Sequence, residues 1–261
     1  MPDSLQLTSV HLRVPDLARS TEFYSGQLGF VVVGQQADTV EFATAAGAAP
    51  ILKLTGDSTA SAAPRDAAGL FHAALLFPTR ADLGAWLRQA AERDVGFDGF
   101  SDHGVSDAIY LTDPDGNGLE FYTDRPREVW PFAANGELAM ITQPLDAPAL
   151  LADGGPTKKF PLAGARWGHL HLRAIDLPRS EAFYHEALGV VVTQRSYPGA
   201  RFMAADGYHH HVAINTWTSS RGPQPSGALG LVAATFARAG LTEPKRLPAP
   251  EGYTLALEPL R

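Results

Sequence analysis

Residues 16–24 read Asp-Leu-Ala-Arg-Ser-Thr-Glu-Phe-Tyr, and residues 176–184 read Asp-Leu-Pro-Arg-Ser-Glu-Ala-Phe-Tyr. The match extends on both sides at a constant offset of 160 positions. It covers roughly twenty-five residues without a gap, which indicates an internal duplication. In each copy apolar residues alternate before the aspartate, which is suited to cap a helix, and β-branched residues follow the glycine at position 29 or 189. Each copy therefore predicts a strand, a helix and a second strand.

Two further units follow the copies. Residues 69–124 predict a strand, an amphipathic helix near 80–93 and more strands. Residues from about 227 to 261 repeat the landmarks of that unit with about half the residues between them, so most of the helix is missing. We predict an α+β fold of four β-α-β-β-β units that form two modules, the fourth unit being shortened.

The segment between the two modules differs in kind. Residues 125–166 contain six prolines and show no clear period. A connection of this length in a compact protein usually docks on a surface. We therefore divide the chain into a first module at 1–125, a linker at 126–166 and a truncated second module at 167–261.

Composition narrows the class of protein. The chain has 261 residues, 45% of them hydrophobic, with a formal net charge of −7 and no run rich in Lys or Arg, which argues against a nucleic-acid surface. It contains no cysteine, so any metal must be held by imidazole and carboxylate groups. The sequence shows neither a signal peptide nor an apolar run long enough to span a bilayer. We expect a cytoplasmic protein that does not bind membranes.

Two stretches carry a resemblance to a known family. Residues 102–120 read Asp-His-Gly-Val-Ser-Asp-Ala-Ile-Tyr-Leu-Thr-Asp-Pro-Asp-Gly-Asn-Gly-Leu-Glu, and residues 207–217 read Gly-Tyr-His-His-His-Val-Ala-Ile-Asn-Thr-Trp. The first resembles the extradiol dioxygenase motif, with Ser101 as a departure, and the second is similar to the segment that carries the acid–base histidine of those enzymes. Together with the four units, they resemble the vicinal oxygen chelate superfamily, which includes glyoxalase I, fosfomycin-resistance proteins and extradiol dioxygenases.

The likeness is strongest to the catechol-2,3-dioxygenase-like, two-module branch, and it is weakest after residue 218. It implies a metal-dependent extradiol dioxygenase of aromatic catabolism that cleaves a catechol-type diol. The cofactor implied is Fe(II), with Mn(II) or Zn(II) as alternatives. The implied partners are a small aromatic substrate and dioxygen, and a homodimer is compatible with the sequence.

In the families that this chain resembles, the metal ligands lie on the first strand of one unit and on the first and last strands of its partner. The corresponding positions are Ser9 in unit one, His72 and Glu120 in unit two, His169 in unit three, and Ala233 and Ala256 in unit four. The losses of ligand side chains are complementary. Units one and four have no ligand side chain at these positions, whereas units two and three together supply two imidazoles and a carboxylate. We therefore predict that these two units pair, within one chain or across a dimer, and that His72, Glu120 and His169 bind the metal.

Each ligand also has a structural alternative. A lone histidine in an apolar strand, such as His72, is often a core residue that is bonded to the backbone. Glu120 is more informative, because an unpaired carboxylate buried between apolar neighbours costs several kcal/mol and a metal removes that cost. His11 is the fallback for the third ligand.

The resemblance also implies roles beside the metal. His210 corresponds to the acid–base histidine, and His211 takes its place if the register differs by one residue, because neighbours in a strand face opposite sides. The alternative for this triplet is a solvated strand end. His103 and Tyr110 resemble the pair that hydrogen-bonds the substrate oxygen, although Tyr110 could be an ordinary strand aromatic.

Two other functions remain open on the same scaffold. A glyoxalase-like lyase or isomerase, or a thiol transferase, commonly has a second carboxylate at the metal, and residues 50–55 contain none. A non-catalytic protein that binds a small molecule is compatible with the shortened fourth unit.

Overall fold

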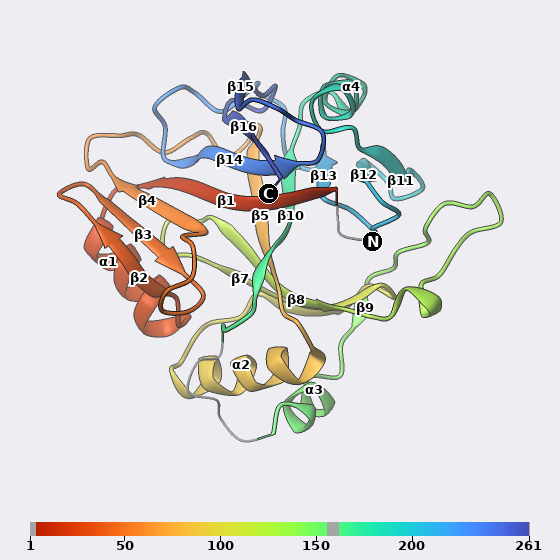
Figure 1. Ribbon diagram of the computed structural model, residues 1–261, viewed down its shortest axis with the longest axis horizontal. Coiled ribbons are helices and arrows are strands. Elements are labelled where there is room, and N and C mark those ends of the chain that lie inside the picture. Colours follow the sequence, from red (N-terminus) through yellow and green to blue (C-terminus); the bar gives the residue numbers. More distant parts are fainter. Residues whose placement is uncertain (1–3, 156–161, 261) are drawn as a thin grey trace.

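The fold consists of two mixed β-sheets that meet near the middle of the molecule (Figure 1). This computed structural model describes residues 4–155 and 162–260. In Figure 1 the strands of the first sheet extend across the upper half, and helices α2 and α3 lie together at the bottom. The α+β architecture predicted from the repeats is confirmed.

The first sheet is built from units one and four. Its seven strands run in the order β15-β16-β14-β1-β4-β3-β2. Their bounds are β1 Leu5–Val14, β2 Val31–Gln35, β3 Thr39–Ala43, β4 Leu52–Gly56, β14 Gly230–Arg238, β15 Lys245–Pro248 and β16 Thr254–Pro259. In its described part, up to residue 260, the fourth unit contributes these last three strands and no helix, as its short length predicted.

The second sheet is built from units two and three, with one short strand from the linker. Its nine strands run in the order β11-β12-β13-β10-β5-β8-β7-β6-β9. Their bounds are β5 Gly69–Leu76, β6 Gly99–Asp102, β7 Ser106–Thr112, β8 Gly118–Asp124, β9 Gln143–Pro144, β10 Arg166–Arg173, β11 Val191–Gln194, β12 Ala200–Ala204 and β13 Val212–Asn215.

The helices of the repeated motif begin at the capping residues that the sequence predicts. Asp16 and Asp176 each accept a hydrogen bond from the backbone N–H three residues later, so both copies of the repeated motif begin a helix in the same way. Gly189 ends the second of these helices in the left-handed conformation. The helices are α1 Leu17–Thr21, which continues as the π-helix η1 Glu22–Gln27, α2 Arg80–Glu92, the short 3-10 helix η2 Arg127–Val129, α3 Ala147–Asp153 and α4 Leu177–Leu188.

The two sheets are built by the same pairing rule. β1 pairs antiparallel with β14 in the first sheet, and β10 pairs antiparallel with β5 in the second. Unit two therefore pairs with unit three inside one chain, which confirms the pairing predicted from the complementary losses. Each sheet takes one unit from either side of the linker. The division of the chain into modules at 1–125 and 167–261 stays a prediction.

The repeated motif clamps the two sheets together. Its tyrosine in unit one, Tyr24, donates a hydrogen bond to the buried Asp113 carboxylate in the turn between β7 and β8, at 2.9 Å. Its equivalent, Tyr184, donates to the buried Glu251 carboxylate between β15 and β16, at 2.5 Å. The serine of the second copy, Ser180, donates to the other oxygen of Glu251. Each helix is thereby bonded to a turn that belongs to the opposite sheet.

The linker docks on the second sheet and its helix. Helix α3 packs on α2 so closely that a side chain at Gly84 would meet the backbone of Leu150, so this contact requires glycine. The strand β9 then extends the sheet by pairing with β6. The linker thus occupies a surface, as its length predicted.

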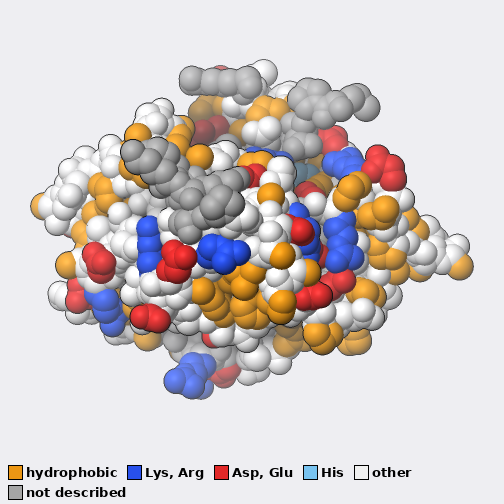
Figure 2. Space-filling model, turned by 90° about the horizontal axis from the view of Figure 1, so that it is seen from below, with side chains coloured by type: hydrophobic (Ala, Val, Ile, Leu, Met, Phe, Trp, Pro, Cys, Tyr) orange, Lys and Arg blue, Asp and Glu red, His pale blue; other side chains and the backbone are white. Residues whose placement is uncertain are grey.

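Figure 2 shows one face of the molecule, on which basic and acidic side chains are interspersed among apolar ones. They do not gather into a basic patch on this face, in keeping with the net charge of −7. Among the described residues no helix is both long and apolar enough to cross a membrane.

The clamp predicts a measurable contribution to stability. Replacing Tyr24→Phe removes one donor from a buried carboxylate and should lower the free energy of unfolding by about 1–3 kcal/mol. Tyr197→Phe is the matched control, since its hydroxyl bonds to Thr142 at an exposed position, and should change stability by less than about 0.5 kcal/mol. Urea unfolding measures both, and equal effects of the two variants would contradict the clamp.

Candidate metal centre and cavity

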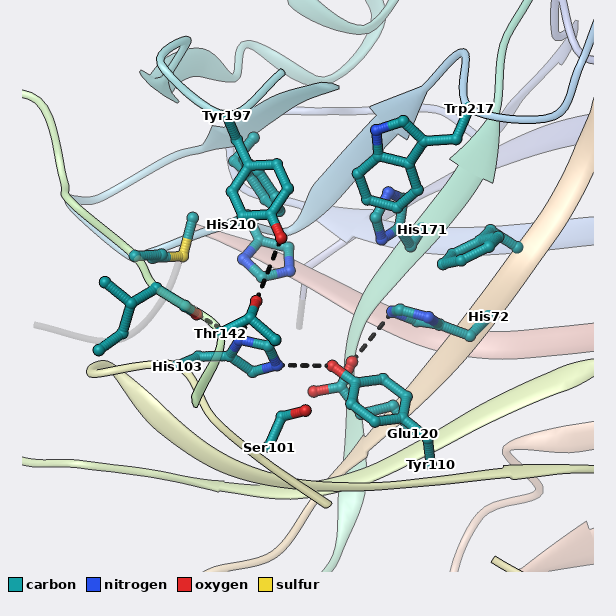
Figure 3. A pocket seen from close by; sticks show the side chains of 14 residues that line it. His72, Ser101, His103, Tyr110, Glu120, Thr142, His171, Tyr197, His210 and Trp217 are labelled. Carbon is teal, nitrogen blue, oxygen red and sulfur yellow. Dashed lines mark hydrogen bonds and ion pairs between the residues drawn. The ribbon is translucent and has the colours of Figure 1, made fainter. Parts of the chain in front are cut away.

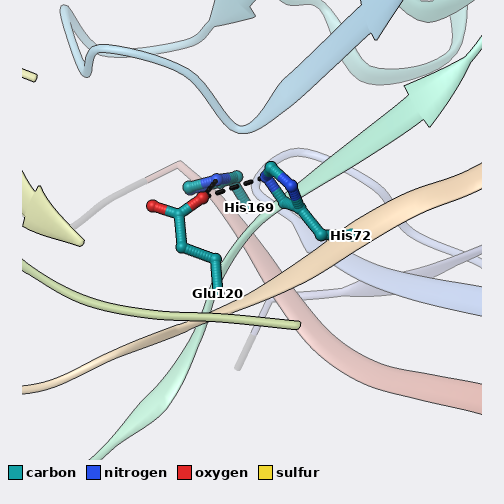
Figure 4. A group of neighbouring side chains, drawn as sticks. All are labelled: His72, Glu120 and His169. Atoms are coloured by element: carbon teal, nitrogen blue, oxygen red, sulfur yellow. Dashed lines mark hydrogen bonds and ion pairs between the residues drawn. The ribbon is translucent and has the colours of Figure 1, made fainter. Parts of the chain in front are cut away.

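Three neighbouring strands hold the predicted ligands together. His72 lies on β5, Glu120 on β8 and His169 on β10, and these strands are adjacent in the second sheet. All three side chains are buried, and one ligand atom from each lies within 4.8 Å of the other two. Figure 4 shows the two imidazoles converging on the carboxylate.

The local backbone of β10 places His169 in this position. The pairing of β10 with β5 has register shifts between Trp167 and His169 and again between His171 and Leu172. Such bulges change the direction of side chains near functional sites. The residue at the first shift is Gly168, where a Cβ atom would collide with the hydroxyl of Tyr122, so glycine is required for this close approach.

The distances fit a shared metal ion. Nε2 of His72 lies 2.9 Å from Oε2 of Glu120, and Nε2 of His169 lies 3.2 Å from the same oxygen. Two ligand atoms that each lie about 2.1 Å from one metal ion, with an angle of about 90° at the metal, are about 3 Å from each other. The His72 nitrogen is buried and has no hydrogen-bond partner of suitable geometry among the described residues. Two imidazoles and one carboxylate are also the donor set that suits a catalytic divalent metal.

Electrostatics favours an ionised Glu120 carboxylate beside a neutral His169. Burial by itself would raise the pKa of Glu120, but the neighbouring imidazoles, that of His169 first and then that of His72, hold it well below its ordinary value. Burial lowers the pKa of His169 to about 4, in spite of the opposing effect of Glu120. Unprotonated nitrogen and ionised carboxylate are the forms that bind a metal.

A cavity of about 300 Å³ opens beside this group (Figure 3). His72 and Glu120 form part of its wall, together with the predicted residues His103, Tyr110 and His210. The remaining lining residues are Phe71, Ser101, Met140, Ile141, Thr142, His171, Tyr197, Phe202 and Trp217. The cavity therefore brings side chains from units two and three and from the linker to one place.

His103 and Tyr110 form a hydrogen-bonded pair in the cavity wall. Nδ1 of His103 lies 2.7 Å from the carbonyl oxygen of Ile141, and its Nε2 lies 2.7 Å from the Tyr110 hydroxyl. The carbonyl can only accept, so Nδ1 donates and Nε2 of a neutral His103 accepts from Tyr110. Burial and the Glu120 carboxylate raise the pKa of Tyr110 well above its ordinary value, so the phenol keeps its proton.

The three adjacent histidines precede β13 in a loop, so the strand alternation assumed for them from sequence was wrong. His210 lines the cavity, and its ring centre lies 4.0 Å from that of His169. His209 is buried behind it, and His211 accepts a hydrogen bond from the backbone of Ala205 and does not line the cavity. His210 is therefore the member of the triplet that a bound molecule can contact.

Sequence reasoning missed several residues of the wall. His171 follows His169 by two positions on the same strand face, and this spacing was the available signal. Burial and the neighbouring His72 and His169 lower its pKa well below the ordinary value, and its Nε2 bonds to Asn215. The linker residues Met140, Ile141 and Thr142 carried no signal, because nothing in their spacing indicates a cavity.

The first sheet has lost the equivalent site. His11, the fallback ligand, bonds to Thr55 at 2.8 Å and lines a separate cavity with Ser9 and Ala233. Burial and the charge of Lys53 lower the pKa of His11 to about 4. His11 therefore lies in the other sheet and does not join the group of His72, Glu120 and His169.

A family model and a named relative each match most of this chain. Residues 6–121 and 166–243 match the model of the glyoxalase/bleomycin resistance protein/dioxygenase superfamily. The chain is 37% identical over 238 residues to a protein named catechol-2,3-dioxygenase from Bacillus subtilis (strain 168), covering 86% of this chain and 83% of that protein.

Solved structures with little sequence identity share the fold. A candidate dioxygenase from Bacillus subtilis subsp. subtilis str. 168 has a TM-score of 0.66 and 11% identity, covering 98% of this chain and 86% of its own. Glyoxalase I from Zea mays has a TM-score of 0.56 and 14% identity, covering 98% and 92%. At these identities the comparison concerns fold alone.

The geometry predicts how metal binding depends on single residues. His72→Ala, His169→Ala and Glu120→Gln should each weaken binding of a divalent metal by about tenfold or more, because each removes a ligand. Titration of the metal-free protein with Fe(II) or Mn(II) measures this. His11→Ala is the matched control, because it removes an imidazole from the other sheet and should leave affinity unchanged. Normal affinity in the His169→Ala protein would contradict the site.

Proposed function

Because this chain belongs to the glyoxalase/bleomycin resistance protein/dioxygenase superfamily, we propose that it is an extradiol dioxygenase that cleaves a catechol-type aromatic diol. The observation that carries the proposal is the group of His72, His169 and Glu120, which opens on a cavity that also contains His210. The bond between one hydroxyl-bearing carbon and its unsubstituted neighbour would break. Both atoms of dioxygen would be retained, one at each carbon, so no external reductant is needed.

The metal proposed is Fe(II), with Mn(II) and Zn(II) as the alternatives that titration distinguishes. When bound by two histidines and one carboxylate, Fe(II) supplies open positions for the diol oxygens and for dioxygen. The protein would contribute orientation and proton transfer. His210 lies in the cavity wall beside the metal group, where its imidazole would take a proton from a substrate hydroxyl.

Tyr110 and His103 would fix the position of the substrate oxygen. When His103 is neutral, the Tyr110 hydroxyl donates a hydrogen bond to it, and the phenol oxygen keeps lone pairs that would accept a hydrogen bond from a hydroxyl of the diol. The bond from His103 to the carbonyl of Ile141 holds this pair against the linker. The linker would thereby help to set the distance between Tyr110 and the ring.

A glyoxalase-like activity has less support from the cavity. Glu120 is the one carboxylate among the described residues that line it, so a second acidic ligand is missing from this wall. A non-catalytic binder of small molecules would not need His210 beside the metal group. These considerations favour the dioxygenase.

The apolar part of the wall favours an uncharged, apolar substituent on the ring. Phe71, Phe202, Ile141 and Trp217 belong to this part, and the described lining includes no Lys or Arg that would pair with a carboxylate. Trp217 and Ile141 are 42% and 39% exposed, so they border the mouth of the cavity. Figure 3 shows Trp217 on the side opposite Tyr110. An alkyl or aryl group that projects toward this mouth would be desolvated without a buried charge.

Ring cleavage is the direct test. The protein should be loaded with Fe(II) under anaerobic conditions, mixed with catechols and then exposed to air, and it should give yellow ring-opened products. The His210→Gln protein should bind the same amount of iron but turn over about 10²- to 10⁴-fold more slowly, as expected for loss of a general base. Colourless mixtures with a broad panel of catechols would contradict the proposed function.

Selectivity is tested at the mouth of the cavity. Trp217→Ala should lower kcat/KM for a 4-alkyl- or aryl-catechol about tenfold more than for catechol itself, because only the substituent loses its apolar contact. Val191→Ala, at an exposed edge of the sheet, is the matched control and should change neither value. Equal losses for both substrates would show that Trp217 does not contact the substituent.

A further inference from the structure

A chain of hydrogen bonds runs from the cavity to the protein surface behind His210. Nδ1 of His210 lies 2.7 Å from Nδ1 of His209, and Nε2 of His209 lies 2.9 Å from Oδ1 of Asp124. His210 lines the cavity, whereas the side chain of Asp124 is 26% exposed. His209, which joins them, has a fully buried side chain.

His209, the middle residue of this chain of hydrogen bonds, is restrained by its neighbours. The ring of His209 lies with its centre 4.0 Å from that of Tyr208 and 5.4 Å from that of Trp130. Its backbone carbonyl accepts a hydrogen bond from Thr193 at 2.6 Å. Two neighbouring aromatic rings and the backbone hydrogen bond restrain His209, so its two nitrogens bond to the partners named above.

The positions of the protons follow from the partners. Oδ1 of Asp124 already accepts a hydrogen bond from the Tyr208 hydroxyl, so it is an acceptor toward His209 as well. Nε2 of His209 therefore donates, and in a neutral imidazole its Nδ1 carries only a lone pair. Two Nδ1 atoms at 2.7 Å need one hydrogen between them, so that hydrogen belongs to His210. Nε2 of His210 is then left unprotonated.

We propose that Asp124 is a positioning residue that acts through His209 to hold His210 in the tautomer whose Nε2 is a base facing the cavity. Nε2 is the other nitrogen of a ring that lines the cavity, and it has no hydrogen-bond partner among the described residues, so it is available to a bound molecule. A carboxylate that orients a histidine and selects its tautomer is a recurring arrangement in general-base catalysis. The catalytic consequence rests on the proposed dioxygenase function, but the tautomers themselves do not.

The tautomers are tested directly in the metal-free wild-type protein. Two-dimensional ¹⁵N–¹H NMR of the imidazole rings, assigned with His209→Asn and His210→Gln proteins, reports which nitrogen of each ring carries hydrogen. The expected result is a proton on Nε2 of His209 and on Nδ1 of His210. A proton on Nε2 of His210, or protons on both nitrogens of His209, would overturn the proposal whether or not the protein cleaves catechols.

A variant tests the role of the carboxylate. Asp124→Leu keeps a similar shape but removes the acceptor, so the two histidines should populate both tautomer pairs, and the NMR signals of His210 should shift toward the Nε2-protonated form. With Fe(II) and a substrate that the wild-type protein cleaves, kcat should fall by about 10- to 100-fold, with KM and iron content little changed. Unchanged tautomers in this variant would overturn the role of Asp124.

Asp98→Leu is the matched control. Asp98 is an exposed aspartate whose carboxylate accepts a hydrogen bond from Thr112. The same substitution there should leave the His210 tautomer and kcat unchanged. An equal fall in kcat in both variants would mean that the substitution acts by general destabilisation, and would contradict a specific role of Asp124. Tautomers as expected in a protein that cleaves no catechol would refute the dioxygenase and leave the positioning role intact.

Discussion

The antiparallel pairing of β5 with β10 is the constraint on which the rest of the structure depends. It joins a strand of the first half of the chain to a strand of the second half, and it places His72 and His169 on adjacent strands. β8 then pairs parallel with β5 and brings Glu120 beside both. A carboxylate buried at this position would be unfavourable without two nitrogen partners, so the pairing and the site support each other.

The same pairing explains how a duplicated chain keeps one site. β1 and β14 repeat the geometry of β10 and β5, including the register shifts on either side of the histidine positions. Serine and alanine stand at the ligand positions of that first sheet, and His11 bonds to Thr55 instead. The first sheet therefore retains the framework, and it supports the second through the clamps of Tyr24 and Tyr184.

The linker and the loop before β13 supply cavity residues that do not come from the repeated strands and helices. Gln194 bonds to both the backbone N–H and the carbonyl of Met140, which fixes the linker as a wall of the cavity. The loop before β13 places His210 in the cavity and His209 behind it. The linker lies between the repeated units, and the loop lies inside unit three but outside its strands.

The sequence alone specifies the units and their helix caps, and it predicts the group of candidate metal ligands. Repetition aligns equivalent residues, so Ser9 and His169 can be compared before any fold is known, and the complementary losses predict which units pair. The fold was needed to show that the pairing forms within one chain, and that His210 rather than His211 reaches the cavity. It also placed Ile141 and Trp217 in the wall. Periodicity describes regular strands and helices, whereas loops and linkers take their conformation from long-range contacts that leave no period in the sequence.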